Sequence, residues 1–311
     1  MFGGRPRPFR QLIDAVRLAS GQLRYPLCGS ERYAPFFIVG SGRCGSTLLR
    51  RILEANSHVH IPPEIPILSR QIELFRRVQH LDWAEVVHLV FAPFEFSVMS
   101  VDHGVAIRPL VMELVDAQSS ERNLACLLDR YYRYHGETRG KSVRRWGDKT
   151  PINVFALDEV RSVFPDARFI HVLRDGVDVV ASMIDQGRTL EYAANRWVTS
   201  VRSATRFARS YAKQCLLIRY EELVTEPSAV VERVCDFTGI PFVRSMLSQS
   251  EHVPNMGDVP LHHHHRRVSQ PISAASVGRG RANLTSSQKR QLRPMLEPTL
   301  FEFGYERMTE T

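Results

Sequence analysis

Short apolar runs alternate with segments of helical periodicity from residue 35 onward. Three of these runs, at residues 35–40, 168–174 and 215–223, predict strands because they are rich in Phe, Ile, Leu and Val. Strands that alternate with helices are typical of a parallel sheet covered by helices on both faces. The pattern therefore predicts a three-layer α/β fold with a central, mainly parallel sheet.

Helices are predicted where apolar residues recur three or four positions apart. The segment 46–56 has this period after the first strand. A second helix follows the strand at 168–174, and Asp175 can cap it. A third is expected at 227–238, ended by Gly239.

Two longer helical regions contain prolines. The segment 67–134 is mostly helical in period, with an expected break at Pro93 and an irregular stretch at Asp102–Gly104. The last helical stretch, 286–303, is expected to break or kink at Pro294 because proline removes a helical hydrogen bond.

The domain organisation follows from these elements. Residues 1–34 are interpreted as an N-terminal helical extension, with a basic amphipathic helix over Gln11–Leu23, and residues 35–311 as a single domain. Between 248 and 281 the composition shifts to Ser, His, Pro, Gly and Arg, and periodicity is lost. This segment is expected to form a long loop over the domain, and such loops are often functional.

Composition narrows the class of protein. The chain has 311 residues, 43% of them hydrophobic and 24% charged, which is typical of globular proteins. No apolar run approaches the roughly 20 residues that span a bilayer. The basic start lacks the apolar core of a secretory signal, so the expected location is the cytoplasm.

Cysteines and charge add little by themselves. The five cysteines are odd in number and widely scattered, which indicates neither a disulfide framework nor a metal site. The net charge of +8 fits nucleic acid, an anionic membrane or a polyanionic small molecule equally well.

The strongest motif is the glycine-rich segment Gly40–Thr47 between the first strand and the following helix. Its glycines permit a tight turn whose backbone N–H groups surround an anion, and the helix beginning near Gly45 adds its positive end. Ser46 and Thr47 can donate from their hydroxyls. The context favours a phosphate-binding loop over a purely structural turn.

One position separates this loop from that of nucleoside triphosphate hydrolases. Ser46 stands where those proteins and the related kinases carry a lysine for the β- and γ-phosphates. Arg43 instead places a guanidinium fork inside the loop, which suits a phosphate or a sulfate.

A second anion-binding element is predicted after the strand 168–174. Arg174 lies at its carboxyl end, where α/β sheets bind ligands, and Ser182 follows about two helical turns later. The pair can hold a phosphate separate from the first, although an ordinary salt bridge between Arg174 and Asp175 also fits this pattern.

In this order along the chain, the motifs resemble those of sulfotransferases that use 3′-phosphoadenylyl sulfate (PAPS), in particular tyrosylprotein sulfotransferases and their bacterial relatives. The resemblance covers residues 35–281 and implies a P-loop-like fold with PAPS as co-substrate. In that family the loop binds the 5′-phosphosulfate and the second element binds the 3′-phosphate. The resemblance thus assigns nucleotide contacts to Arg43, Cys44, Gly45, Ser46, Thr47, Arg174 and Ser182.

Two further residues match the family near the nucleotide. Tyr220 resembles a tyrosine at the end of the next strand, beside the adenosine, and a tyrosine packed in the core fits the same pattern. Arg279 matches a basic residue of a C-terminal loop that closes over the nucleotide, so that much of 267–276 would form a lid.

Glu64 and Lys149 match the reacting residues of the family. Two prolines precede Glu64 and favour a fixed, extended backbone, and the resemblance implies that this glutamate takes the acceptor proton. Lys149 lies in the polar segment 146–151, and the resemblance implies that it contacts the transferring sulfate together with Arg43. From residue type alone, both charges would be assigned to the solvated surface.

The lid departs from the family pattern. Tyrosylprotein sulfotransferases carry a catalytic serine early in the lid, and counting back from Arg279 puts His264 near that position, whereas a shorter lid would put Ser269 there. The choice between them stays open. A metal site in the run His262–His265 is disfavoured because four adjacent histidines cannot all converge on one ion, and no metal is predicted.

The predicted function is transfer of a sulfuryl group from PAPS to an acceptor hydroxyl, with adenosine 3′,5′-bisphosphate (PAP) as product. A carbohydrate or small-molecule alcohol is the expected acceptor, and a peptide tyrosine is the alternative. The acceptor pocket is expected within 67–145. Its candidate lining residues are Phe91, Phe94, Phe96, His103 and Arg108.

Two other classes of protein compete with this interpretation. A P-loop kinase or hydrolase is disfavoured by Ser46, and a nucleic-acid binder is disfavoured because the basic residues do not cluster in one tract interleaved with aromatic residues.

Overall fold

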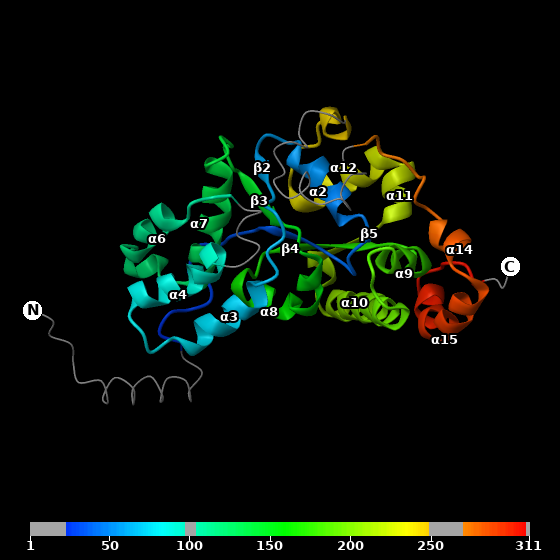
Figure 1. Ribbon diagram of the computed structural model, residues 1–311. Helices are drawn as coiled ribbons and strands as arrows, with labels where there is room; N and C mark the ends of the chain where they lie inside the picture. Colours follow the sequence, from blue (N-terminus) through cyan, green and yellow to red (C-terminus); the bar gives the residue numbers. More distant parts are fainter. Residues whose placement is uncertain (1–22, 97–103, 249–269, 309–311) are drawn as a thin grey trace, which may run out of the picture.

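A parallel β-sheet forms the centre of the molecule (Figure 1). The structure, a computed structural model, describes residues 23–96, 104–248 and 270–308. Within these ranges the sheet has five strands in the order β2-β3-β1-β4-β5, and every neighbouring pair is parallel. The strands are β1 (Phe36–Val39), β2 (Val59–His60), β3 (Arg145–Asp148), β4 (Arg168–Leu173) and β5 (Cys215–Arg219). The predicted α/β fold is confirmed.

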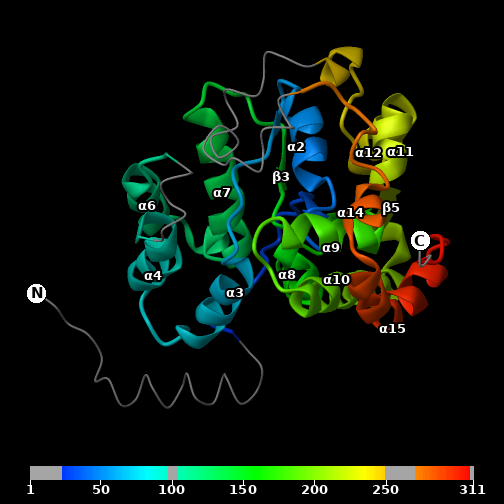
Figure 2. The same cartoon turned by 45° about the vertical axis from the view of Figure 1, so that its right-hand side comes forward.

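Helices cover both faces of this sheet. They are α2 (Ser46–Glu54), α3 (Leu68–Arg77), α4 (Trp83–Phe96), α6 (Arg108–Val115), α7 (Leu124–Glu137), α8 (Leu157–Val163), α9 (Gly176–Ile184), α10 (Leu190–Ser210), α11 (Tyr220–Thr225), α12 (Pro227–Thr238), α14 (Arg279–Asn283) and α15 (Ser286–Glu302). Short 3₁₀ helices lie at Ser119–Glu121, Pro151–Phe155, Ala212–Gln214 and Arg244–Leu247. Figures 1 and 2 show α2 and α12 on one face, with α8 and α10 on the other.

The alternation of side chains along β1 explains the layers. Phe36 and Ile38 pack into a core shared with α2 and α12, whereas Phe37 and Val39 face a second core that extends to the helices α3 to α8. All four side chains are buried, as is typical of a central strand in a parallel sheet.

The helix break predicted at Pro93 is wrong, and of the break or kink predicted at Pro294 the break does not occur. Pro93 lies inside α4, and Pro294 lies inside α15. In α15 the residues Leu292, Leu296 and Leu300 recur every four positions and are fully buried. Burial of each leucine contributes roughly 1.5–3 kcal/mol, so the three together are comparable with the cost of about 3 kcal/mol for each of the two prolines inside α15, Pro294 and Pro298.

The third predicted strand is shorter than expected. It ends at Arg219, and Tyr220 begins α11 instead of continuing the strand to residue 223. Glu221 and Glu222 occupy the first turn of α11, where negative side chains are favoured by the helix dipole. The strands β2 and β3 were not predicted.

Other local predictions are confirmed. Asp175 caps α9 by accepting a hydrogen bond from the Val177 N–H at 2.8 Å. Gly239 ends α12 in the left-handed conformation, with φ of 69°. The predicted helix over Gln11–Leu23 lies almost wholly outside the described residues. Within the described ranges, no helix is both long and apolar enough to cross a membrane.

Candidate nucleotide and catalytic site

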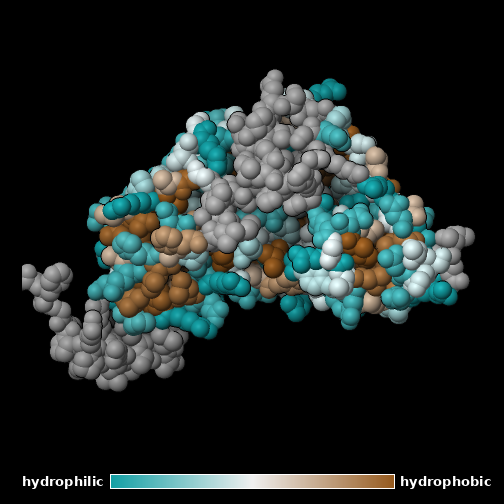
Figure 3. All heavy atoms as spheres, viewed as in Figure 1, coloured by the Kyte–Doolittle hydropathy of each residue, from teal (hydrophilic) through white to brown (hydrophobic). Residues whose placement is uncertain are grey.

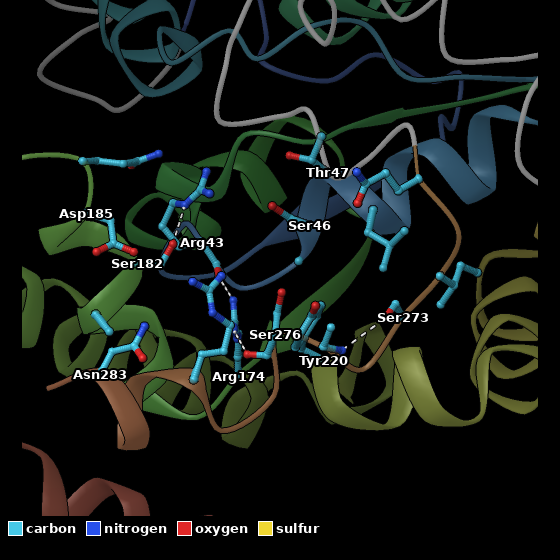
Figure 4. A pocket seen from close by; sticks show the side chains of 18 of the residues that line it. Arg43, Ser46, Thr47, Arg174, Ser182, Asp185, Tyr220, Ser273, Ser276 and Asn283 are labelled. Carbon is cyan, nitrogen blue, oxygen red and sulfur yellow. Dashed lines mark hydrogen bonds between the residues drawn. The ribbon is translucent and has the colours of Figure 1, made fainter.

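A cavity of about 780 Å³ lies at the carboxyl ends of β1, β4 and β5. Its walls come from the loop after β1, from the second half of α9, and from the segment 270–283 (Figure 4). Parallel α/β sheets bind ligands at this edge. The predicted residues that line the cavity are Arg43, Gly45, Ser46, Thr47, Arg174, Ser182, Tyr220 and Arg279.

The loop after β1 turns sharply through left-handed backbone conformations. Gly42, Arg43 and Gly45 have φ of 81°, 55° and 94°. Gly45 is required twice over, because a Cβ there would lie 2.3 Å from the Tyr220 ring and because its φ disfavours other residues. Arg43 holds a conformation that costs roughly 1–2 kcal/mol for a residue other than glycine. The turn brings the N-terminus of α2 to the cavity wall.

Cys44 contributes differently from its neighbours. Its side chain is 1% exposed and packs into the core below the loop, where a Cβ at Gly40 would lie 2.8 Å from Sγ. Burial raises the pKa of this thiol. Only the backbone of Cys44 can therefore contact a ligand.

The second predicted anion element meets the first inside the cavity. Arg43 Nε donates to Ser182 Oγ at 3.2 Å, and Arg174 Nη1 donates to the Arg43 carbonyl at 3.1 Å. The guanidinium of Arg174 also stacks on the Tyr220 ring, 4.5 Å from its centroid. Arg174 forms its ion pair with Asp178 at 3.4 Å, while Asp175 pairs with Arg281. The simple salt bridge between Arg174 and Asp175 is therefore not formed.

The predicted lid is described in part. The segment from Gln270 to Ser276 lines the cavity, and the Gln270 carbonyl accepts from Arg51 Nη1 at 2.8 Å. The end of the predicted loop is instead helical, since Arg279 begins α14. His264, Ser269 and the run His262–His265 lie outside the described residues.

Glu64 and Lys149 form an ion pair beside the cavity. Lys149 is fully buried and also donates to Thr47 Oγ1 at 3.3 Å, whereas the Glu64 side chain is 34% exposed. Pairing of β1 with β3 explains this placement, because Asp148 lies opposite Phe37 and the chain then reaches the loop after β1. The assignment of Lys149 to the solvated surface is thus wrong.

A buried network supports this ion pair. Asp148 accepts from the Tyr132 hydroxyl at 2.7 Å and from Asn153 Nδ2 at 2.9 Å. Burial raises the pKa of Asp148 to about 6, and the hydrogen bonds from Tyr132 and Thr150 oppose that rise. Thr150 Oγ1 also accepts from the Ile65 N–H at 3.1 Å, which fixes the backbone next to Glu64.

Sequence reasoning missed these supporting residues. Tyr132 lies in α7, and nothing in its sequence neighbourhood indicates a partner 16 positions away. The sequence gives one indication that Thr150 belongs to the site, because Thr150 directly follows Lys149. The cavity residues Asp185, Gln186 and Asn283 were also missed.

The expected acceptor lining is partly wrong. Phe91 and Phe94 are 1% and 5% exposed and pack against Tyr131 in the core. Phe96 is 84% exposed, Arg108 lies on the surface, and His103 lies outside the described residues. Figure 3 shows apolar surface over the lobe of α4 and α6. The exposed apolar side chains on these helices include Leu89, Phe96 and Met112.

The cavity offers a ligand positive charge and hydrogen-bond donors. Arg43, Arg174 and Arg279 line it together with the hydroxyls of Ser46 and Thr47. Among the described residues there is no cluster of three or more His, Cys, Asp or Glu side chains that could hold a metal ion. The site thus suits a ligand with more than one anionic group.

Sequence comparisons agree with this geometry. Residues 35–245, more than half of the chain, match the sulfotransferase family. Protein-tyrosine sulfotransferase 1 of Danio rerio is 21% identical over 313 residues, which span 97% of this chain and 81% of that protein. Protein-tyrosine sulfotransferase A of Caenorhabditis elegans is 23% identical over 289 residues, which span 89% of this chain but 62% of that protein.

A solved structure shows the same fold. The sulfotransferase domain of the Synechococcus PCC 7002 olefin synthase has a TM-score of 0.61 at 21% identity, covering 89% of this chain and 96% of that domain. The chain therefore belongs to the sulfotransferase family and is an enzyme of that class. The alternative of a P-loop kinase or hydrolase is not supported.

Proposed function

We propose that the chain transfers the sulfuryl group of PAPS to the hydroxyl of a carbohydrate or small-molecule alcohol and releases PAP. One observation carries the proposal: two anion-binding elements share a cavity, and Thr47 of the first element also accepts from Lys149 of the adjacent ion pair. Two separate anion sites suit a nucleotide with a 3′-phosphate and a 5′-phosphosulfate. A nucleotide bound at both would have its reacting sulfur near Glu64 and Lys149.

The nucleotide would lie along the cavity. The 5′-phosphosulfate would accept from the loop N–H groups, from Ser46 and Thr47, and from the positive end of α2. The 3′-phosphate would lie between Arg174 and Ser182. The Tyr220 ring would pack near the adenosine, and Arg279 would lie over the nucleotide.

The ion pair supplies the chemistry. The acceptor oxygen bonds to sulfur while the bond between sulfur and the bridging oxygen of PAPS breaks, and its electron pair stays on PAP. The acceptor proton moves to the Glu64 carboxylate. Lys149 has three N–H donors, of which Thr47 and Glu64 take two, and the third has no partner among the described residues. This donor can stabilise the charge that develops on the bridging oxygen.

The acceptor is the finer part of the proposal. Counting along the sequence puts His264 near the place of the serine expected in tyrosylprotein sulfotransferases, and this departure favours an acceptor other than tyrosine, whereas a shorter lid would put Ser269 there and favour tyrosine. The names of the relatives make peptide tyrosine the second candidate. Transfer of labelled sulfate from PAPS to a panel of sugars, alcohols and tyrosine peptides separates the two. Label that appears on the peptides alone would overturn the first candidate.

Calorimetric titration with PAP tests the nucleotide site. We expect PAP to bind without metal and more tightly than Mg-ATP. Arg174→Ala should weaken PAP binding roughly 10–100-fold, because a hydrogen bond to a charged group is worth about 1.5–3 kcal/mol.

Arg161→Ala is the matched control for this titration. Arg161 also stacks on a tyrosine, 4.0 Å from the Tyr211 centroid, and it is not among the residues that line the cavity. Its loss should leave PAP affinity unchanged. A preference for Mg-ATP, or equal affinity in both arginine variants, would contradict the proposed site.

A further inference from the structure

A buried carboxylate holds the lid segment against α9. Asp178 lies on the first turn of α9, and its side chain is fully buried. Its Oδ2 accepts from the Gly278 N–H at 2.9 Å, and its Oδ1 accepts from the Gly280 N–H at 2.7 Å. The two glycines lie 100 and 102 positions further along the chain, so this contact joins two distant parts of the sequence.

Arg174 belongs to the same arrangement. Its Nη2 donates to the Ser276 carbonyl at 2.6 Å (Figure 4). The same Nη2 lies 3.4 Å from Asp178 Oδ2. The arginine assigned to the 3′-phosphate therefore contacts both the lid segment and the carboxylate that holds it. We call Arg174, Asp178, Ser276, Gly278 and Gly280 the Asp178 clasp.

Close packing leaves the clasp little freedom. A Cβ at Gly280 would lie 2.4 Å from the Val177 carbonyl oxygen and 2.7 Å from Asp178 Cα, so glycine alone lets the lid backbone reach α9. The Nε of Arg174 is buried and has no hydrogen-bond partner among the described residues. The Arg174 guanidinium in the clasp thus retains an N–H donor that can bind a ligand.

We propose that Asp178 is a positioning residue for the 3′-phosphate. This inference rests on the proposed function. One carboxylate orients Arg174 and seats the segment 276–280 over the same end of the cavity, so closure of the lid and orientation of the arginine form a single event. Asp178 acts through Arg174 and does not contact the nucleotide itself.

The inference makes a prediction about selectivity. Asp178→Asn keeps the size of the side chain but removes its charge. We expect binding of PAP to weaken at least about 10-fold, and binding of adenosine 5′-monophosphate, which lacks the 3′-phosphate, to change less than about 3-fold. In the Arg174→Ala background, Asp178→Asn should weaken PAP binding little further, because residues that act together are not additive.

Asp129→Asn is the matched control. Asp129 is also buried and pairs with an arginine four positions away, Arg133, at 2.7 Å, and it is not among the residues that line the cavity. This variant should bind both nucleotides as the wild type does. Gly280→Ala provides a second test that leaves every charge in place, and it should show the same selective loss of PAP affinity.

The outcomes separate the two proposals. If the wild type does not bind PAP, the proposed function and this inference are both overturned. If the wild type binds PAP while Asp178→Asn and Gly280→Ala weaken both nucleotides equally, or weaken neither, the inference alone is overturned. Additive losses in the double variant would also overturn it. Circular dichroism checks that each variant is folded.

Discussion

The proposed nucleotide half and the proposed catalytic half of the site lie at the same edge of one sheet but are built differently. In the nucleotide half, the donors lie on a short loop with left-handed backbone, at the end of β4 and in the second half of α9, and the Asp178 clasp closes over them. In the catalytic half, a single ion pair, Glu64 and Lys149, depends on a buried network around Asp148. Local backbone geometry positions the donors of the loop in the first half, whereas the ion pair of the second half is positioned by tertiary packing alone.

This difference predicts which property, nucleotide affinity or turnover, is lost when each half is mutated. Damage to the loop changes the positions of many donors at once, so it should lower nucleotide affinity. Damage to the ion pair removes one proton acceptor or one cation, so it should lower turnover and leave affinity unchanged. The following predictions test this separation, beginning with the largest effect.

Glu64→Gln should reduce kcat by roughly 10²–10⁴-fold, the usual contribution of general acid–base catalysis. The amide can still accept from Lys149 but cannot take the acceptor proton. PAP affinity should stay within about 3-fold of the wild type by calorimetry. Glu73→Gln is the control, since Glu73 also pairs with a basic residue, Arg77, but on the exposed surface of α3. A variant at Glu64 that retains full turnover would remove the glutamate from the mechanism.

Gly45→Ala should reverse this pattern by lowering nucleotide affinity roughly 10–100-fold and the free energy of unfolding by about 2–4 kcal/mol. The added Cβ meets the Tyr220 ring at 2.3 Å in a backbone conformation with φ of 94°. Gly140→Ala is the control, because Gly140 has φ of 75° and open space around it. Denaturant unfolding and PAP titration measure the difference. Equal effects at both glycines would show that contact with Tyr220 is unimportant.

Asp148→Asn should alter the dependence of stability on pH. The pKa of Asp148 is raised from 3.8 to about 6, so between these values the native state binds more protons than the unfolded state. Wild-type stability therefore falls as pH rises through this range, by roughly 2–3 kcal/mol, and the variant lacks this fall. Unfolding curves at pH 4 and pH 7 should show that the free energy of unfolding of the variant, relative to that of the wild type, is higher at pH 7 than at pH 4. A constant difference across that range would show that the raised pKa does not affect folding.

The parts that the sequence predicted well are those with local causes. The loop Gly40–Thr47 and the pair of Arg174 and Ser182 were recognised from residue type and spacing, and the structure places both elements in one cavity. The cap at Asp175 was predicted for the same reason. In each case the residues that determine the conformation lie within a few positions of one another.

The parts that were missed have distant causes. The strand β3 contains one large apolar residue, Trp146, and it is a strand because it pairs with β1. Gly147 allows this pairing, since a Cβ there would lie 2.3 Å from the Phe36 ring. Without β3, Lys149 would be assigned to a polar turn, and the role proposed for it rests on the family resemblance. Tyr132 and Asp178 were missed for the same reason, because their partners lie far away in sequence.

The order of the strands has a consequence for synthesis on the ribosome. Phe36 of β1 pairs with Gly147 on one side and with Arg168 on the other, so β1 emerges long before either partner. Parallel pairing over such distances requires large loops to close before any contact repays the lost entropy. The nascent chain thus carries the glycine-rich loop Gly40–Thr47 with no sheet to hold it, and Gly278 and Gly280 of the clasp are made more than 200 residues later. The nucleotide binding proposed above would therefore have to wait until the residues of the clasp have been made.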